Sequence, residues 1–313
     1  MKTIYPDYYN DFKCIADKCK HNCCIGWEID IDEQSLPFYK SVKGEFGKKL
    51  KAGISYEGTP HFILSENERC PFLNQKNLCD IYTNLGKESL CQICKEHPRF
   101  YNKLDDSIEA GLGLCCEEAA RLIITKKDPV KLIGEASNLQ GLPLLREKVF
   151  EELQNRDISV SERIINVFSL FEESVISFDI LMWAEIFESL ERLDESWTKL
   201  LTALKTNYKK ADQNTFAKFI KPRETEYEQF LVYLIYRHAS KAELYEDFML
   251  YTIFSVLSFE LIYAMGAVVF SQKCDFSTQD QLEIMRLFSS EIEYSDQNLD
   301  IILNELEKVV FGY

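Results

Sequence analysis

The chain has 313 residues, more than most single compact domains contain, and this length favours two domains. Its 36 basic and 51 acidic side chains give a net charge of −15, which argues against nucleic acid and anionic membranes as partners, because both are bound mainly through Lys and Arg. An acidic surface suits a lysine-bearing partner better. The first ten residues lack the apolar run of a signal peptide, so we expect a cytoplasmic protein.

Cysteines divide the chain into two parts. Ten of the eleven lie between Cys14 and Cys116, and only Cys274 lies beyond them. Residues 1–125 hold 16 basic against 19 acidic side chains, and the remainder holds 20 against 32. Thiols stay reduced in the cytosol, so this density indicates metal binding or catalysis rather than disulfides. We predict a cysteine-rich metal or iron–sulfur domain over 1–125 and an acidic helical domain over 126–313.

The first domain is predicted to be irregular, with short strands. Apolar and acidic residues alternate from Trp27 to Asp32, which is typical of a half-buried strand. Residues 61–64 and 107–114 are weaker strand candidates, whereas the glycines and proline of 41–60 predict loops and turns. With the helices expected downstream, the fold class is α+β and mostly α.

Helical signals dominate after a linker predicted at residues 126–141. We expect about eight helices between Leu142 and Val310. Residues 248–270 contain only Glu260 as a charge, but the absence of a basic flank favours a central buried helix over a membrane span. Pairs with capping-box spacing predict three helix starts, at Ser159 and Glu162, Thr225 and Glu228, and Ser240 and Glu243. Apolar residues at helical spacing predict a buried face near the end, at Leu299, Ile302, Leu306 and Val309.

Ten thiols exceed the four ligands of one zinc ion or one 4Fe-4S cluster, so they imply two sites, or one site with additional structural or reactive cysteines. Spacing alone leaves zinc and iron–sulfur equally supported. Cys23 and Cys24 are adjacent, and in an extended chain their side chains would leave on opposite faces. Cys115 or Cys116 could instead be small buried apolar residues, and this is the expectation for the isolated Cys274.

Several other chemistries lack support in the sequence. The C-x3-C-x2-C run of radical enzymes would need a cysteine at position 26, which is Gly26. No glycine-rich turn follows a strand, so a Rossmann-type cofactor site is not expected. Four histidines without a Gly-x-Ser-x-Gly elbow do not support a hydrolase triad. Of these, His97 beside Cys94 is a candidate for orienting a ligand sulfur, and His21 is more simply a loop residue.

The order of the cysteine groups resembles the flagellin lysine N-methylases, within bacterial proteins that carry a CxxCxxxxCC-type zinc- or iron-chelating region. The resemblance covers about 110 residues. It is carried by Phe12-Lys13-Cys14, Cys19, the run from Cys23 to Asp32, Cys70-Pro71-Phe72-Leu73, Leu78-Cys79-Asp80-Ile81-Tyr82, Leu85-Gly86, Leu90, Cys94, Pro98-Arg99, and the run from Cys116 to Leu122.

The resemblance implies methyl transfer from S-adenosylmethionine to flagellin lysines, with a cysteine-bound iron–sulfur cluster. Cys91 and Cys115 fall where the family is expected to vary and are second choices, and Glu117 stands where a proline often follows the last cysteine. The metal ligands that it implies are Cys14, Cys19, Cys23, Cys24, Cys70, Cys79, Cys94 and Cys116.

A lysine must lose its proton before it can attack a methyl carbon, so a methylase needs a base. Glu28, Asp30 or Asp32 could supply a carboxylate, although a solvated strand face is the simpler interpretation of each. The other catalytic residues and the S-adenosylmethionine site are left unassigned. The alternative function is a non-enzymatic zinc- or iron-binding adaptor whose helical domain holds a partner.

Overall fold

The structure is a computed structural model that describes residues 2–104, 106–134 and 139–312, and it divides into two compact units. The cysteine unit comprises Lys13–Phe100 and Cys116–Glu118, and the helical unit comprises Met1–Phe12, Tyr101–Cys115 and Ala119–Tyr313. The sequence analysis placed all of residues 1–125 in the cysteine-rich domain. In the structure, residues 1–12 and 101–115 group with the helical unit instead. The cysteine unit is an insertion into the chain of the helical unit.

A four-stranded sheet has the order β4-β5-β1-β6. Its strands are β1 (Lys2–Pro6), β4 (Arg99–Lys103), β5 (Ser107–Leu112) and β6 (Leu132–Ile133). β1 runs parallel to β5, with Thr3 opposite Ile108, and antiparallel to β6. The strand predicted at 107–114 is confirmed over 107–112. The predicted linker contains β6, and its residues 135–138 lie outside the described part of the chain.

Nine α-helices follow residue 139 in the part of the chain that the structure describes, which confirms a fold that is mostly α. They are α6 (Gly141–Leu153), α7 (Val160–Leu170), α8 (Ile180–Ser189), α9 (Glu195–Asn207), α10 (Gln213–Ile220), α11 (Glu224–His238), α12 (Tyr245–Lys273), α13 (Thr278–Phe288) and α14 (Asp296–Phe311). The capping box at Ser159 is confirmed, because its hydroxyl accepts from Glu162 N–H and its own N–H donates to the Glu162 carboxylate. On α14, Leu299, Ile302 and Leu306 are buried as predicted, whereas Val309 is exposed.

The other two capping predictions are wrong. α11 begins at Glu224, so Thr225 lies inside it, and Glu228 binds arginines instead of closing a capping box. Ser240 lies in a single 3-10 turn, and the next helix begins only at Tyr245, where the Asp247 carboxylate accepts the Leu244 N–H at 3.2 Å. Both residue pairs have capping-box spacing. At the first, Glu228 forms ion pairs with arginines instead, and at the second, the turn between α11 and α12 delays the start of the next helix.

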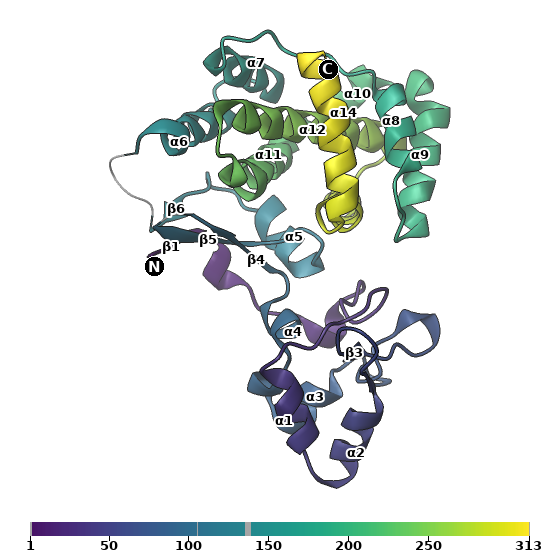
Figure 1. The fold of residues 1–313 in the computed structure, drawn as a ribbon. Coiled ribbons are helices and arrows are strands. Elements are labelled where there is room, and N and C mark those ends of the chain that lie inside the picture. Colours follow the sequence, from purple (N-terminus) through teal and green to yellow (C-terminus); the bar gives the residue numbers. More distant parts are fainter. Residues whose placement is uncertain (1, 105, 135–138, 313) are drawn as a thin grey trace. The chain divides into compact units, whose positions relative to one another are not determined.

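α12 is the central helix of the helical unit. It contacts α8, α9, α10, α11, α13 and α14, and Figure 1 shows it passing between α11 and α14. Among the described residues it is the one helix long and apolar enough to cross a membrane, but 83% of that apolar window is buried inside the protein. It is therefore a core helix, as the sequence indicated. The Tyr236 hydroxyl of α11 lies 3.0 Å from the carbonyl oxygens of Ile4 and Ala110, and so joins the helices to β1 and β5.

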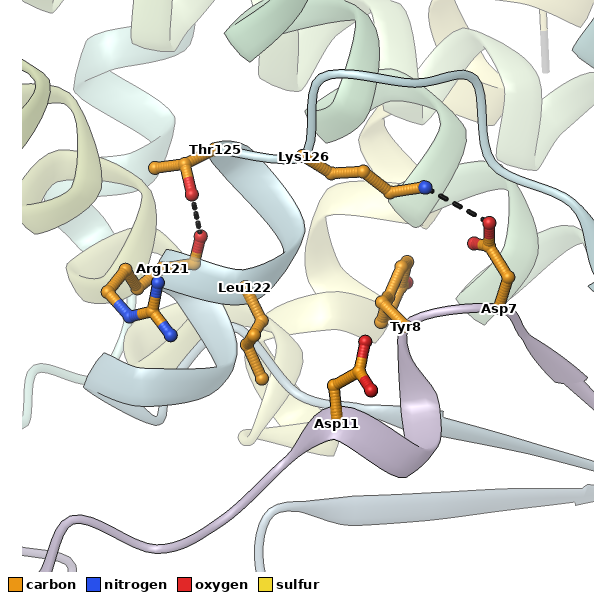
Figure 2. A pocket seen from close by; sticks show the side chains of 7 residues that line it. All are labelled: Asp7, Tyr8, Asp11, Arg121, Leu122, Thr125 and Lys126. Atoms are coloured by element: carbon orange, nitrogen blue, oxygen red, sulfur yellow. Dashed lines mark hydrogen bonds and ion pairs between the residues drawn. The ribbon is translucent and has the colours of Figure 1, made fainter.

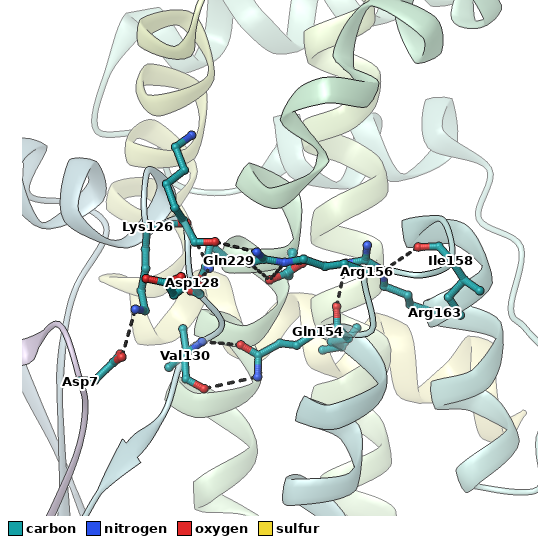
Figure 3. A network of polar contacts seen from close by, with 12 residues as sticks. Asp7, Lys126, Asp128, Val130, Gln154, Arg156, Ile158, Arg163 and Gln229 are labelled. Carbon is teal, nitrogen blue, oxygen red and sulfur yellow. Dashed lines mark hydrogen bonds and ion pairs between the residues drawn. The ribbon is translucent and has the colours of Figure 1, made fainter.

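A buried carboxylate fixes the segment that follows α5 (Glu117–Ile124). Glu228 of α11 accepts hydrogen bonds from Arg156 at 2.7 Å and from Arg163 at 2.7 Å. The Arg156 guanidinium also donates to the Lys127 carbonyl at 2.6 Å, and Gln229 donates to the Lys126 and Asp128 carbonyls. Figure 3 shows these bonds converging from α11 and the end of α6 on residues 126–130. The network holds Lys126 in a defined place.

The cysteine unit consists of short elements joined by turns. They are α1 (Ser35–Ser41), α2 (Gly44–Ala52), β2 (Ile54–Ser55), β3 (His61–Phe62), α3 (Asp80–Leu85) and α4 (Gln92–Glu96). The prediction of loops over 41–60 is wrong, because α2 occupies 44–52. Its Gly47 lies so close to the Val42 backbone carbonyl that any Cβ would clash with it. Here a glycine serves close packing inside a helix rather than a turn.

The segment from Trp27 to Asp32 is extended but forms no named strand. Ile29 and Ile31 are buried while Glu28 and Asp30 are exposed, so the predicted alternation is confirmed. Its pairing includes a bridge between Asp30 and His61, with Phe62 N–H donating to the Ile29 carbonyl and Ile31 N–H donating to the Pro60 carbonyl. The prediction at 61–64 is confirmed over His61–Phe62.

Single helical turns complete the chain. The 3-10 turns are Tyr9–Asp11, Ala16–Lys18, Glu66–Glu68, Lys87–Ser89, Tyr208–Lys210, Lys221–Arg223 and Ala239–Lys241, and Ser289–Glu293 forms a π-helical turn.

Candidate metal centre

Five thiols gather in the hydrophobic core of the cysteine unit. Cys70 and Cys91 are buried, and Cys24, Cys79 and Cys94 pack against the same core from partly buried positions. The core also contains Phe62 and Phe72, whose rings meet edge to face at 4.9 Å. The remaining buried members are Ile29, Ile31, Tyr39, Leu50, Ile54, Leu73 and Ile81. A core this small has thiols in place of much of its aliphatic bulk, which is typical of a unit that relies on a metal for stability.

Short backbone contacts bring these cysteines together from distant parts of the chain. The Cys70 N–H donates to the Cys24 carbonyl at 2.8 Å, and Cys79 forms a bridge with Leu73. Cys79 and Cys91 each stand directly before a short helix, as the N-cap residues of α3 and α4. At such a position the first amides of the helix can donate to the sulfur.

Two pairs of thiols are in hydrogen-bond contact. In one pair, a hydrogen bond from Cys94 lowers the pKa of Cys91, while the same contact and burial raise the pKa of Cys94. In the other, the contact with Cys24 lowers the pKa of Cys23, which is exposed.

The structure corrects the expectation that Cys23 and Cys24 point apart. They lie in a turn rather than in an extended strand, so adjacent side chains can meet. Their surroundings still differ, because Cys24 has Cys70 and Cys79 as electrostatic neighbours and Cys23 is at the surface.

Burial makes these thiols reluctant to ionise alone. It raises the pKa of Cys70 to about 11 and also raises the pKa of Cys79, although amides of the following residues oppose the effect. A bound metal cation reverses this balance, since it deprotonates a coordinating thiol outright. The gathered residue types therefore fit a thiolate-bound metal.

The residue types fit a metal site, but the positions of the candidate ligand side chains must also be considered. Within the described ranges, no three Cys, His, Asp or Glu side chains converge closely enough to hold a single metal ion. A zinc ion needs four donors that share one centre, whereas the cysteines of an iron–sulfur cluster bind different irons.

A second group of cysteines lies apart from the core set. Cys19 has Cys116 as an electrostatic neighbour and contacts the Glu117 carboxylate at 3.6 Å. That carboxylate also accepts the Lys20 N–H at 2.8 Å, and burial followed by Glu117 raises the pKa of Cys19 to about 12. Glu117 thus fastens the loop around Cys19. Cys14 is exposed.

Two cysteines belong to the helical unit instead. Cys115 forms a hydrogen bond with the side chain of Tyr294, and the Arg237 guanidinium lies 4.6 Å from the centre of the Tyr294 ring. Cys274 is exposed at the C-cap of α12 with a positive φ, so the expectation of a buried residue is wrong for it.

The carboxylates suggested as bases for lysine deprotonation differ in how far their oxygens are already used by other hydrogen bonds. Asp32 accepts hydrogen bonds from the N–H groups of Gln92, at 2.7 Å, and of Ser35, so its carboxylate is used to join two helix starts. Burial tends to raise the pKa of Asp32, but these bonds outweigh it and lower the pKa. The Glu28 carboxylate lies exposed, 3.4 Å from His61.

His97, the residue suggested to orient a ligand sulfur, packs 6.0 Å from Trp27 between ring centres. Burial lowers the pKa of His97 to about 4, so its imidazole is neutral near pH 7.

Comparison with known proteins adds a finding independent of the cysteines. Residues 175–312, from before α8 to the end of α14, match the model of the FliB lysine N-methylase C-terminal domain. This segment of the helical unit is therefore similar to the C-terminal domain of the flagellin lysine N-methylase family. This confirms the resemblance noted in the cysteine groups, and it does so through the helical unit.

Curated relatives within the family are distant. Over 149 residues the chain is 26% identical to "Flagellar biosynthetic protein FliU" of Salmonella muenchen, covering 45% of this chain and 87% of the relative. It is also 26% identical, over 135 residues, to each "Lysine-N-methylase" of Salmonella choleraesuis and Salmonella typhimurium, covering 41% of this chain. The matched segment spans only 33% of those two methylases. No solved structure matches the chain significantly.

Proposed function

We propose that the protein is a cytoplasmic, S-adenosylmethionine-dependent lysine N-methyltransferase that acts on flagellin. The observation that carries the proposal is the match of residues 175–312 to a lysine N-methylase domain, supported by two relatives named lysine-N-methylase and a third named as a flagellar biosynthetic protein. The net charge of −15 agrees with a substrate segment that bears lysines.

In this reaction the lysine nitrogen forms a bond to the methyl carbon as the bond from that carbon to the sulfonium sulfur breaks. The donor leaves as a neutral thioether, and one proton leaves the nitrogen. The lysine must be neutral to attack, so a base or a water path has to accept its proton before transfer. Exposed Glu28 is better placed for this than Asp32, whose oxygens accept backbone hydrogen bonds.

The metal in this proposal is an iron–sulfur cluster. When bound, such a cluster supplies an iron that can anchor polar groups of a ligand. We propose the core set of Cys24, Cys70, Cys79, Cys91 and Cys94 as its source of ligands, because these five thiols share one core. This choice brings Cys91 forward from second place. Cys14, Cys19, Cys23 and Cys116 stay candidate metal ligands outside this core set.

A metal-binding adaptor is the second candidate function. The observation in its favour is coverage, since the chain matches only a third of the length of the named methylases. In that case the cysteine unit would be structural and the helical unit would hold a partner.

Anaerobic purification followed by iron, labile-sulfide and zinc analysis separates the two candidates. Iron with sulfide, together with methyl groups on flagellin lysines that vanish in a deletion strain, supports the methyltransferase. Stoichiometric zinc without sulfide would remove the cluster from the proposal, and unmodified flagellin in the wild type would leave the adaptor.

A matched pair of variants tests the ligand set. We expect Cys91→Ala to lose most of the bound iron, whereas Cys115→Ala retains it, because the Cys115 thiol contacts Tyr294 in the helical unit. Equal iron loss from both variants would contradict this division.

A further inference from the structure

A surface of the helical unit exposes apolar side chains where the end of α7 meets the start of α12. The Tyr245 ring lies 5.6 Å from the ring of Phe171, and the Phe171 ring lies 6.1 Å from that of Phe248, so the two segments are side by side. Phe171 and Phe248 are buried, whereas Tyr245 is 43% exposed and Leu244 is 62% exposed. The aromatic packing of the core therefore continues to the surface, where one large ring is left open to solvent.

Three carboxylates lie close to this exposed ring. Burial, followed by the negative charges of Glu172, Glu173 and Glu246, raises the pKa of the Tyr245 hydroxyl. None of the three carboxylates forms an ion pair with another of the described residues. We call Leu244, Tyr245 and these three carboxylates the Tyr245 surface.

The two segments that form the Tyr245 surface supply negative charge only. Residues 164–191 contain six acidic side chains and no basic one, and residues 242–272 contain four acidic side chains and no basic one. Lys241 precedes the second segment directly, but its acidic neighbours are at residues 293–300. The Tyr245 surface thus carries uncompensated negative charge, which attracts a cationic partner and repels phosphate groups.

These features together suit a lysine side chain. Its ammonium is attracted to the carboxylates, and its aliphatic stem can lie on the exposed Tyr245 ring, whose face also attracts the cation. A metal ion needs oxygens that converge on one point, and in the part of the chain that the structure describes no three acidic, cysteine or histidine side chains do so. An uncharged apolar segment would leave the carboxylates unused. The fitting occupant is a polypeptide segment in which a lysine stands near an apolar residue that covers Leu244.

We propose that the Tyr245 surface docks a lysine-bearing segment of the protein substrate. The inference rests on the proposed methyltransferase function, which requires such a substrate, and it assigns substrate docking to the helical unit. Because the charges on this surface are exposed, each contributes less than a buried ion pair would, and together they favour rapid encounter and correct orientation more than tight binding. The affinity should fall as ionic strength rises.

Fluorescence anisotropy with the full-length protein tests this assignment without requiring turnover. The probe is a fluorescein-labelled synthetic peptide of lysine, leucine and serine, and the control peptide has glutamate in place of each lysine. We expect the wild type to bind the lysine peptide more tightly. At low ionic strength, Glu172→Gln combined with Glu173→Gln should weaken this binding about 3- to 10-fold, and Tyr245→Ala should weaken it by a similar factor. The matched control is Glu147→Gln combined with Glu151→Gln, which removes the same charge from exposed positions on α6.

A glycine variant separates binding from folding. Glu172 follows the C-cap of α7 with a φ of +59°, a left-handed conformation that glycine adopts without strain. Glu172→Gly should therefore leave the urea midpoint of unfolding unchanged or raise it, while it weakens binding of the lysine peptide about 2- to 3-fold. Weaker binding by a variant of unchanged stability does not result from misfolding.

Three other outcomes decide between the docking assignment and the proposed reaction. Equal affinity for the lysine and glutamate peptides, or surface variants that bind the lysine peptide as the control variant does, would overturn the docking assignment, whatever mass spectrometry shows for flagellin. Surface variants that lose peptide binding but methylate flagellin at the wild-type rate would also overturn it. Charge-dependent peptide binding by a protein that leaves flagellin unmodified would support the docking surface and reject methylation of flagellin.

Discussion

Removal of the Glu228 carboxylate should destabilise the helical unit. The side chain is fully buried, and it is paired with Arg163, whose side chain is 4% exposed, and with Arg156, which is 34% exposed. In Glu228→Ala both arginines lose their counter-ion. Water can reach Arg156, but Arg163 keeps only carbonyl partners, so most of the loss comes from one stranded buried charge. Loss of one partner from a buried pair costs about 3–5 kcal/mol, and the exposure of Arg156 places our expectation near 3 kcal/mol.

Urea unfolding followed by tryptophan fluorescence measures this loss, because Trp183 and Trp197 are buried in the same unit. Glu195→Ala serves as the control, since Glu195 is 93% exposed and its pair with Lys199 spans 3.9 Å, and it should change the free energy of unfolding by less than about 0.5 kcal/mol. If Glu228→Ala were no more harmful than that control, the argument that a single buried carboxylate holds this region would be refuted.

Three further predictions follow from local features. Cys24→Ser should remove more bound metal than Cys23→Ser, because only Cys24 packs against the thiol core, and equal loss on elemental analysis would contradict this. Burial raises the pKa of Glu260 from 4.5 to about 7, so the unfolded chain releases this proton at lower pH than the folded protein does. As pH rises from 4.5 to 7, the free energy of unfolding should therefore fall by about 1–2 kcal/mol, a figure that allows for solvent screening of Glu260. Denaturation curves at several pH values measure this fall. In Glu260→Gln the part of the pH dependence that comes from this carboxyl group should vanish. Gly47→Ala should destabilise the cysteine unit by about 1–3 kcal/mol because its Cβ meets the Val42 carbonyl, whereas a stabilised variant would show that the glycine serves only as a weak helix former.

Periodic patterns in the sequence predicted most of the helical unit. The apolar surface of α12 indicated a core helix, and Ser159 marked the start of α7 correctly. Local sequence patterns gave wrong helix starts where contacts with distant parts of the chain override local preference. Thr225 has capping-box spacing to Glu228, yet that carboxylate is taken by two arginines from other parts of the chain, which no local window reveals.

The cysteine groups could be recognised from the sequence, but their division could not. Spacing gives no sign that Cys91 joins the core while Cys115 turns to Tyr294, because both depend on contacts between distant segments. Asp7 and Arg121 line a pocket of the helical unit (Figure 2) but belong to no sequence motif, because only the fold brings residue 7 and α5 together.

The insertion of the cysteine unit has a practical consequence for dissecting this protein. β1 lies before it and β5 after it, and the two strands pair directly, so the helical unit is assembled from chain ends on both sides of the cysteines. A fragment cut at residue 126 would lack β1 and β5, leaving β6 without its partner strand and the Tyr236 hydroxyl without either carbonyl. An expression fragment that retains residues 1–12 and 101–313, with a linker in place of residues 13–100, keeps the residues that make these contacts.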